Sequence, residues 1–122
     1  MTLERLAQFP IITYETGYTG RSHIDAAFRA AGLAPNMVLV AMDADVIKTY
    51  VELGLGVGII AALAYDEERD RQLAAIDARH LIADNLTRLA VRRDSYLRDY
   101  TYAFIATFAA PLTRAAVDEA RE

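Results

Sequence analysis

Apolar residues in the first half of the chain alternate between short continuous runs and helical spacing. Three of the runs are bounded by turn residues and are predicted to be buried strands, at residues 10–14, 37–42 and 57–62. Two helices are predicted between them, one over residues 22–31 and one that begins at Asp43 or Asp45. Two strand–helix–strand units in succession favour parallel pairing with right-handed crossovers, which is typical of a layered α/β domain.

The second half of the chain has a weaker pattern. Short strands are predicted at residues 73–77 and 88–92, and a long helix follows over residues 95–109. Aromatic residues recur at every fourth position of that helix and form one stripe: Tyr96, Tyr100, Phe104 and Phe108. Because the preceding strands already account for a small α/β core, two interpretations stay open. The stripe packs within the chain, or it covers a partner that the chain does not contain.

Composition and charge fit one folded domain and exclude several functions. The chain has 122 residues, of which 54% are hydrophobic, so a single core is feasible. Its formal net charge of −4 lacks the positive excess that binding to a phosphate backbone requires. With no cysteine it has no disulfide, no thiol nucleophile and no thiolate metal site. The chain by itself is therefore predicted to bind nucleic acid poorly.

No segment predicts a membrane span or an export signal. The longest uncharged apolar stretch, residues 53–65, is well short of the roughly 20 residues that cross a bilayer, and it is predicted to be buried core. Glu4 and Arg5 stand where a signal peptide would need its apolar stretch. We therefore expect a cytoplasmic protein with no membrane partner.

Candidate catalytic and metal-binding residues do not assemble into a known pattern. Ser22 and Ser95 are the two serines, and neither lies in a G-x-S-x-G motif. His23 and His80 are far apart and have no metal-ligand spacing. The glycines of residues 54–58 leave a helix and enter a strand, the reverse of a dinucleotide-binding fingerprint, so they predict a tight turn. We expect no catalytic residue, no metal site and no cofactor.

Two groups of acidic residues are interpreted as structural. Asp43 and Asp45 stand at a predicted helix start, where helix capping is favoured over a functional carboxylate pair. The acidic residues of the segment 66–71 are interleaved with Arg69 and Arg71. This segment is therefore predicted to be a solvated surface.

The loop of residues 16–22 is the best candidate for a binding site, because it follows a strand and opens a helix. Backbone N–H groups and the positive end of the helix dipole are available at such a position, and Thr16, Thr19 and Ser22 add hydroxyl donors. A small anion or a carboxylate would fit there, whereas the lysine of a nucleotide-binding P-loop is missing. The alternative is a capping box of Ser22 with Asp25, which needs no ligand.

Three strings of residues resemble the effector-binding domain of LysR-type transcriptional regulators of the CysB/Cbl branch. They are Thr-Gly-Arg-Ser at residues 19–22, Asp-Ala-Asp-Val-Ile-Lys-Thr-Tyr-Val at residues 43–51 and Gly-Leu-Gly-Val-Gly-Ile at residues 54–59. The glycine string is shared by many LysR-type regulators, whereas the string at residues 43–51 is much more specific to the branch. The similarity continues from Arg92 to Asp118 and so covers nearly the whole chain.

The resemblance implies a fold like half of a periplasmic binding protein, with three layers and a mostly parallel central sheet. Residues 1–86 correspond to the second subdomain of the effector-binding domain, without its first strand. Residues 87–122 correspond to a return crossover strand and C-terminal helices, which would pack on a first subdomain that the chain does not contain. Such a piece would expose unpaired backbone and apolar surface, so self-association is expected.

The resemblance also implies a sensing function rather than catalysis. In this branch a small effector, sulfate or an O-acetylserine-type metabolite, lies in the cleft between the subdomains. A hydroxyl of the Thr-Gly-Arg-Ser motif contributes to binding, which corresponds to Thr19, and Gly20, Thr16 and Ser22 stand beside it. DNA would be bound only through a winged helix-turn-helix outside this chain. The parent protein would regulate sulfur assimilation and cysteine biosynthesis as a homo-oligomer, a dimer or, at full length, a tetramer.

Two positions depart from the pattern that the resemblance leads us to expect. Met42 stands where a smaller or polar residue is expected, and Leu86 stands where a second threonine is expected before Thr87. Both departures bear on the identity of the effector. The alternative function is a free-standing anion-binding module, similar to a solute-binding protein, with no role on DNA. A small metabolic enzyme is a weaker alternative, since it would need a nucleophilic or proton-transfer group of residues.

Overall fold

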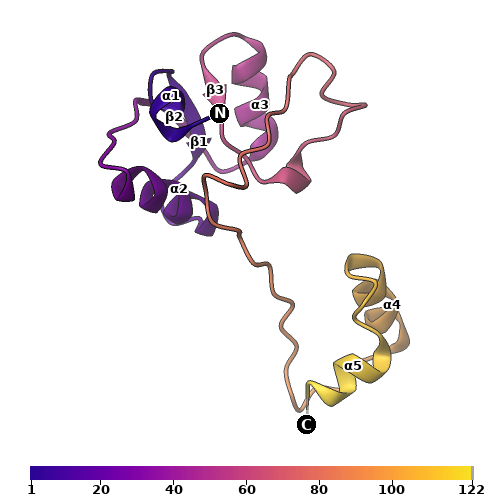
Figure 1. The fold of residues 1–122 in the computed structure, drawn as a ribbon. Helices are drawn as coiled ribbons and strands as arrows, with labels where there is room; N and C mark the ends of the chain where they lie inside the picture. The colour runs from indigo at the N-terminus through magenta and orange to yellow at the C-terminus, as the bar shows by residue number, and fades with distance from the viewer. Residues whose placement is uncertain (122) are drawn as a thin grey trace. The chain divides into compact units, whose positions relative to one another are not determined.

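Two units make up the chain, Met1–Leu86 and Thr87–Glu122 (Figure 1). The structure is a computed structural model and describes residues 1–121. Within those residues, no helix combines the length and the apolar character that crossing a bilayer requires. The candidate binding loop belongs to the first unit, and the aromatic stripe belongs to the second.

A three-stranded parallel sheet in the order β2-β1-β3 organises the first unit. Its strands are β1 (Ile11–Tyr14), β2 (Met37–Ala41) and β3 (Val57–Gly58). Ile12 of the central strand pairs with Leu39 on one side and with Gly58 on the other. The predicted parallel sheet is confirmed, although its third strand ends at Gly58 rather than at residue 62.

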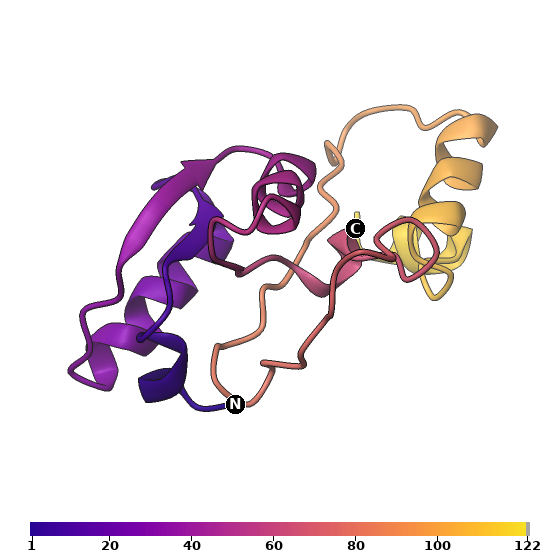
Figure 2. The same cartoon turned by 90° about the horizontal axis from the view of Figure 1, so that it is seen from above.

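Helices cover both faces of this sheet and complete three layers (Figure 2). They are α1 (Leu3–Leu6), α2 (Thr19–Ala30) and α3 (Ala44–Glu52). On one face Ile11 packs with Leu6 of α1 and Phe28 of α2 in the main buried cluster. Successive residues of a strand point to opposite faces, and on the second face Gly58 lies against Ile47 of α3. The predicted α/β layering is confirmed.

Local capping chemistry sets the ends of the helices. Thr2 accepts a hydrogen bond from the N–H of Arg5 at the start of α1, and Asp43 accepts one from the N–H of Asp45 at the start of α3. Gly32 and Gly54 follow α2 and α3 with φ of 67° and 80°. Glycine is favoured there, because the left-handed region is strained for other residues.

The apolar stretch 53–65 is only partly buried. Ile59 joins the main core cluster, but Leu53 is exposed and the side chain of Leu63, in the short 3₁₀ helix η1 (Ala62–Ala64), is 98% exposed. The prediction of a fully buried stretch is wrong, because β3 is two residues long and the chain leaves the sheet soon after it.

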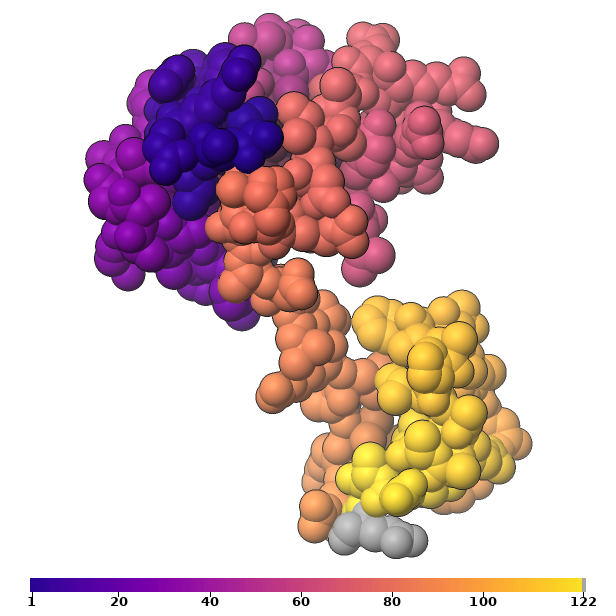
Figure 3. All heavy atoms as spheres, in the orientation of Figure 1, coloured from indigo at the N-terminus to yellow at the C-terminus, as the bar shows by residue number. Residues whose placement is uncertain are grey.

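The irregular segment at the end of the first unit still packs on its N-terminus. Ile82 lies against the core cluster, and the His80 ring nitrogen Nε2 is 3.1 Å from the Met1 carbonyl oxygen. In Figure 3 the salmon atoms of this segment lie beside the indigo N-terminal atoms. The strand predicted at residues 73–77 is wrong, because these residues have no strand partner within the described part of the chain.

The second unit consists of an extended segment and two helices, α4 (Asp99–Phe108) and α5 (Arg114–Glu119). Ile105 and Val117 are its buried apolar residues, and the Tyr102 hydroxyl donates to Asp118 at 2.5 Å. The strand predicted at residues 88–92 is wrong, since that segment has no strand partner within the described residues. The long helix begins four positions later than predicted, so Tyr96 lies before it and only Tyr100, Phe104 and Phe108 of the predicted stripe belong to α4. All four aromatic side chains are exposed.

We expect Gly56→Ala to destabilise the first unit. A β-carbon at Gly56 would lie 2.2 Å from the Pro10 carbonyl oxygen, which accepts the hydrogen bond of Val57 where β1 and β3 meet. The backbone has to move, at a cost of about 1–3 kcal/mol. Urea denaturation followed by circular dichroism measures the change.

Gly20→Ala is the matched control for that substitution. A β-carbon at Gly20 would make an ordinary contact, 3.5 Å from the Tyr14 ring, and alanine in a helix gains about 0.5–1 kcal/mol over glycine. A Gly56→Ala protein as stable as the Gly20→Ala protein would contradict the close approach of β1 and β3.

Candidate functional site

The candidate loop joins the carboxyl end of β1 to the start of α2. Gly17 turns the chain with φ of 105°, and α2 begins at Thr19, three residues earlier than the sequence predicts. The side chains of Thr16 and Thr19 are exposed, and Gly20 is half-buried. Among the described residues, the backbone N–H groups of Thr19 and Gly20 have no intramolecular acceptor. The loop therefore presents hydroxyl and N–H donors at the positive end of a helix dipole.

The capping box of Ser22 with Asp25 does not form. The Ser22 hydroxyl donates to the Thr19 carbonyl oxygen at 2.7 Å, and Asp25 instead forms an ion pair with Arg21 at 2.7 Å. The cap position is Tyr18, which makes no side-chain capping bond. The physical reason is the earlier helix start, which moves Ser22 into the first turn, where its hydroxyl meets a carbonyl group instead of free N–H groups.

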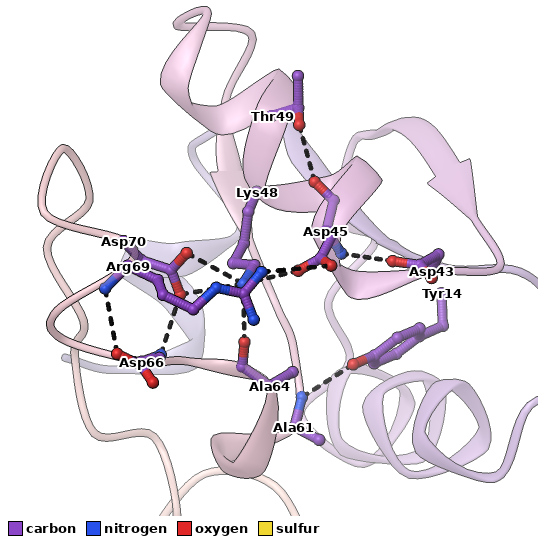
Figure 4. Close-up of polar contacts among 10 residues, drawn as sticks. All are labelled: Tyr14, Asp43, Asp45, Lys48, Thr49, Ala61, Ala64, Asp66, Arg69 and Asp70. Atoms are coloured by element: carbon purple, nitrogen blue, oxygen red, sulfur yellow. Dashed lines mark hydrogen bonds and ion pairs between the residues drawn. The ribbon is translucent and has the colours of Figure 1, made fainter.

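Tyr14 and Arg21 hold the start of α2 against the sheet. Arg21 donates from Nη1 to the Tyr14 carbonyl oxygen at 3.0 Å, and the Tyr14 and Tyr18 rings stack with centroids 6.4 Å apart. The Tyr14 hydroxyl accepts a hydrogen bond from the Ala61 N–H at 3.1 Å (Figure 4). Both segments that leave this edge of the sheet are therefore joined through one side chain.

A buried lysine cluster lies on the α3 side of the same edge (Figure 4). Lys48 donates from Nζ to both carboxylate oxygens of Asp70 at 3.0 Å and to the Ala64 carbonyl oxygen at 2.9 Å. It also pairs with Asp45 at 2.8 Å. The side chains of Lys48 and Asp70 are only 7% and 9% exposed. The prediction that residues 66–71 are a solvated surface is wrong for Asp70.

The charges of this cluster stabilise one another. The hydrogen bond that Lys48 donates to Asp45, followed by the one that it donates to Asp70, raises the pKa of Lys48. The backbone N–H of Asp66, followed by Lys48, lowers the pKa of Asp70. All three donor directions of the ammonium group meet an acceptor, so Lys48 acts as a clamp on residues 64–70 and not as a free base.

The sequence does not predict this cluster, because its members lie in separate parts of the linear pattern. Asp45 is predicted to be a helix cap and Asp70 to be part of a charged surface, and 22 residues separate Lys48 from Asp70. The one available signal is a lysine inside a string that resembles a specific family branch, at residues 43–51. Within the described residues no cluster of three or more potential metal ligands occurs.

Comparison with known proteins identifies the family of this chain. The sequence profile described as LysR substrate binding domain matches residues 1–112. The chain belongs to the LysR substrate-binding domain family. The resemblance stated from the strings at residues 19–22, 43–51 and 54–59 is thereby confirmed.

Relatives in this family are named as transcriptional regulators. The chain is 53% identical to the HTH-type transcriptional regulator SsuR of Burkholderia cenocepacia, over 96% of the chain and 38% of that protein. It is 48% identical to the regulator CysB of Haemophilus influenzae, over 98% of the chain and 37% of that protein. The chain thus spans little more than a third of the length of these relatives.

A solved structure of the family shares the fold. The crystal structure of the cofactor-binding domain of the Cbl transcriptional regulator matches with a TM-score of 0.78 and 41% sequence identity. The match covers 97% of this chain and 52% of that structure. The LysR effector-binding fold, similar to that of periplasmic binding proteins, is therefore confirmed, and the assignment of Thr19, Gly20, Thr16 and Ser22 to an effector site stays a prediction.

The buried cluster predicts how stability depends on pH. The folded-state pKa of Asp70 lies below its unfolded value, so its contribution to stability is complete above the unfolded pKa and is lost as pH falls through the folded pKa. We expect Asp70→Asn to lower the urea midpoint at pH 7 and to make the decline between pH 5 and the folded pKa shallower. Urea midpoints across this pH range measure both effects.

Asp77→Asn is the matched control in high salt. Arg79 lowers the pKa of Asp77 to about 2, yet the two side chains are 57% and 80% exposed. Salt screens exposed pairs and affects buried pairs much less. At high ionic strength the Asp77→Asn difference should vanish while the Asp70→Asn difference persists, and equal behaviour of the two variants would contradict the burial of Asp70.

Proposed function

We propose that the chain is the second subdomain of the effector-binding domain of a LysR-type regulator, and that it senses a small anion. The candidate effectors are sulfate and an O-acetylserine-type metabolite, bound in a cleft that a first subdomain completes. The observation that carries the proposal is the start of α2, where Thr16 and Thr19 stand exposed beside unpaired N–H groups. Family membership supports the proposal, because the matching family is described as a substrate-binding domain.

Neutral donors supply the binding chemistry in this proposal. The Thr19 hydroxyl and the N–H groups of Thr19 and Gly20 donate to the anion, with Thr16 at the rim of the loop. Ser22 contributes less than its sequence position indicates, because its proton is used on the Thr19 carbonyl oxygen. The dipole of the 12-residue helix α2 adds a favourable field at its N-terminus.

The second unit supports the proposal that a first subdomain belongs to the same protein. Three aromatic side chains at every fourth position of α4 are exposed: Tyr100, Phe104 and Phe108. Exposed aromatic residues that share one face of a helix favour a contact surface. Since the chain covers 52% of the Cbl domain structure, we propose that the first subdomain is the part that covers α4.

Effector binding would act on DNA at a distance. An anion held between the two subdomains biases their relative position and the packing of subunits in a dimer or tetramer. That bias changes the affinity of a winged helix-turn-helix for its operator, with a coupling of typically about 1–3 kcal/mol. The genes controlled would serve sulfur assimilation and cysteine biosynthesis, in keeping with the names of the relatives.

Thr19→Ala is expected to weaken effector binding about tenfold or more, because a hydrogen bond to a charged group contributes about 1.5–3 kcal/mol. Calorimetric titration of the complete effector-binding domain with sulfate and O-acetylserine measures the change. Thr49→Ala is the control, since Thr49 is an exposed helical threonine whose hydroxyl donates to the Asp45 carbonyl oxygen. Equal affinities for the Thr19→Ala and wild-type domains would refute the site.

The reading frame upstream of Met1 is expected to encode the first subdomain and a winged helix-turn-helix. Sequencing that region tests the DNA-binding part of the proposal, and operator binding by the full-length protein with and without effector tests the coupling. A frame that encodes an export signal in place of a DNA-binding module would favour the free-standing anion-binding protein.

A further inference from the structure

Tyr14 contacts both segments that leave the carboxyl edge of the sheet. Its ring lies beside Gly20 in the first turn of α2, within ordinary contact distance of the position that a β-carbon there would take. Its hydroxyl oxygen lies 3.1 Å from the backbone nitrogen of Ala61, which follows β3. One side chain thus spans the distance between the proposed effector loop and the end of the neighbouring strand.

The Tyr14 hydroxyl accepts a hydrogen bond through its oxygen, and its proton is free to be donated to a ligand. The oxygen accepts the Ala61 N–H, whereas the proton has no acceptor among residues 1–121. A hydroxyl that accepts a hydrogen bond becomes a stronger donor, because chained hydrogen bonds polarise one another. Tyr14 is only half-buried, and the hydrogen bond at its hydroxyl is exposed to solvent.

The partner of this hydroxyl is itself held in place. Ala61 precedes η1, and the Ala64 carbonyl oxygen at the end of η1 accepts from Lys48. Lys48 is anchored by the buried carboxylate of Asp70. The Ala61 N–H therefore comes from a segment that is attached to α3, so the group from which the Tyr14 oxygen accepts is held in place.

We propose that the Tyr14 hydroxyl donates its proton to the oxyanion in the effector site, next to Thr19, and that it thereby links α2 to the segment after β3. The inference rests on the proposed function, because it names a further ligand-contacting and positioning residue of the same site. It also narrows the ligand class. A site built from hydroxyl and N–H donors selects a group with several acceptor oxygens, such as sulfate or a carboxylate, and disfavours cations.

Tyr18 provides a control with the same chemistry. It is the exposed neighbour that stacks on Tyr14, and no hydrogen bond of its hydroxyl is found within the described residues. Removal of its hydroxyl keeps the ring and the stack. A comparison of Tyr14→Phe with Tyr18→Phe therefore isolates one hydroxyl group at one position.

Calorimetric titration of the full-length protein with sulfate tests the proposal. Tyr14→Phe is expected to weaken sulfate binding about tenfold or more, and Tyr18→Phe is expected to leave it unchanged. Wild-type affinity in Tyr14→Phe together with weakened binding in Thr19→Ala would overturn the role of Tyr14 and leave the proposed site standing. Wild-type affinity in both variants would overturn the site itself. Equal weakening by Tyr14→Phe and Tyr18→Phe would also overturn the role of the Tyr14 hydroxyl.

A spectroscopic measurement separates a ligand contact from a structural role. In protein labelled with ¹³C at the tyrosine Cζ, the resonance absent from Tyr14→Phe belongs to Tyr14, and it should shift on addition of sulfate but not of chloride. The Tyr18 resonance should stay in place. A Tyr14 resonance that does not respond to sulfate would overturn the proposal even if Tyr14→Phe binds more weakly, since the loss would then come from altered packing.

Discussion

The parallel pairing of β1 with strands on both of its sides is the constraint on which the rest of the first unit depends. Ile11 and Ile12 are completely buried, one on each face of the sheet, so β1 cannot shift by one residue without exchanging its two faces. Because neighbouring strands are parallel, the segments after β1 and β3 emerge at the same edge. The loop before Thr19 and the segment at Ala61 are neighbours for that reason.

Glycine makes this pairing possible, and a buried ion pair extends it to the next segment. Gly56 lets the backbone before β3 approach Pro10, and Gly58 leaves room for Ile47 of α3. Within the described residues no strand follows β3, and Lys48 attaches the next segment instead through its bonds to residues 64–70. Burying two charges has a large desolvation cost. The Lys48–Asp70 ion pair therefore acts mainly by fixing the path of residues 64–70, and less by adding net stability.

Sequence periodicity was sufficient for the sheet and its helices up to Gly58 and insufficient for the segments that follow β3. Three strands, two long helices and the glycine turns followed from local rules, since each depends on residues close in the chain. The strands predicted at residues 73–77 and 88–92 failed, because strand formation needs a partner and none is available to them in the described part of the chain. The predicted exposure of Asp70 is wrong for a related reason. Its burial depends on the ion pair with Lys48, and no local sequence pattern connects these two residues.

The acidic composition of the chain is compatible with anion sensing, because the proposed site needs no free positive charge. Arg21 is the cation beside the loop, and it is already committed to Asp25 and to the Tyr14 carbonyl oxygen. Recognition by N–H and hydroxyl groups depends on direction and distance rather than on net charge. A net charge of −4 for the chain disfavours nonspecific contact with nucleic acid, in keeping with the proposal that DNA is bound by a separate module.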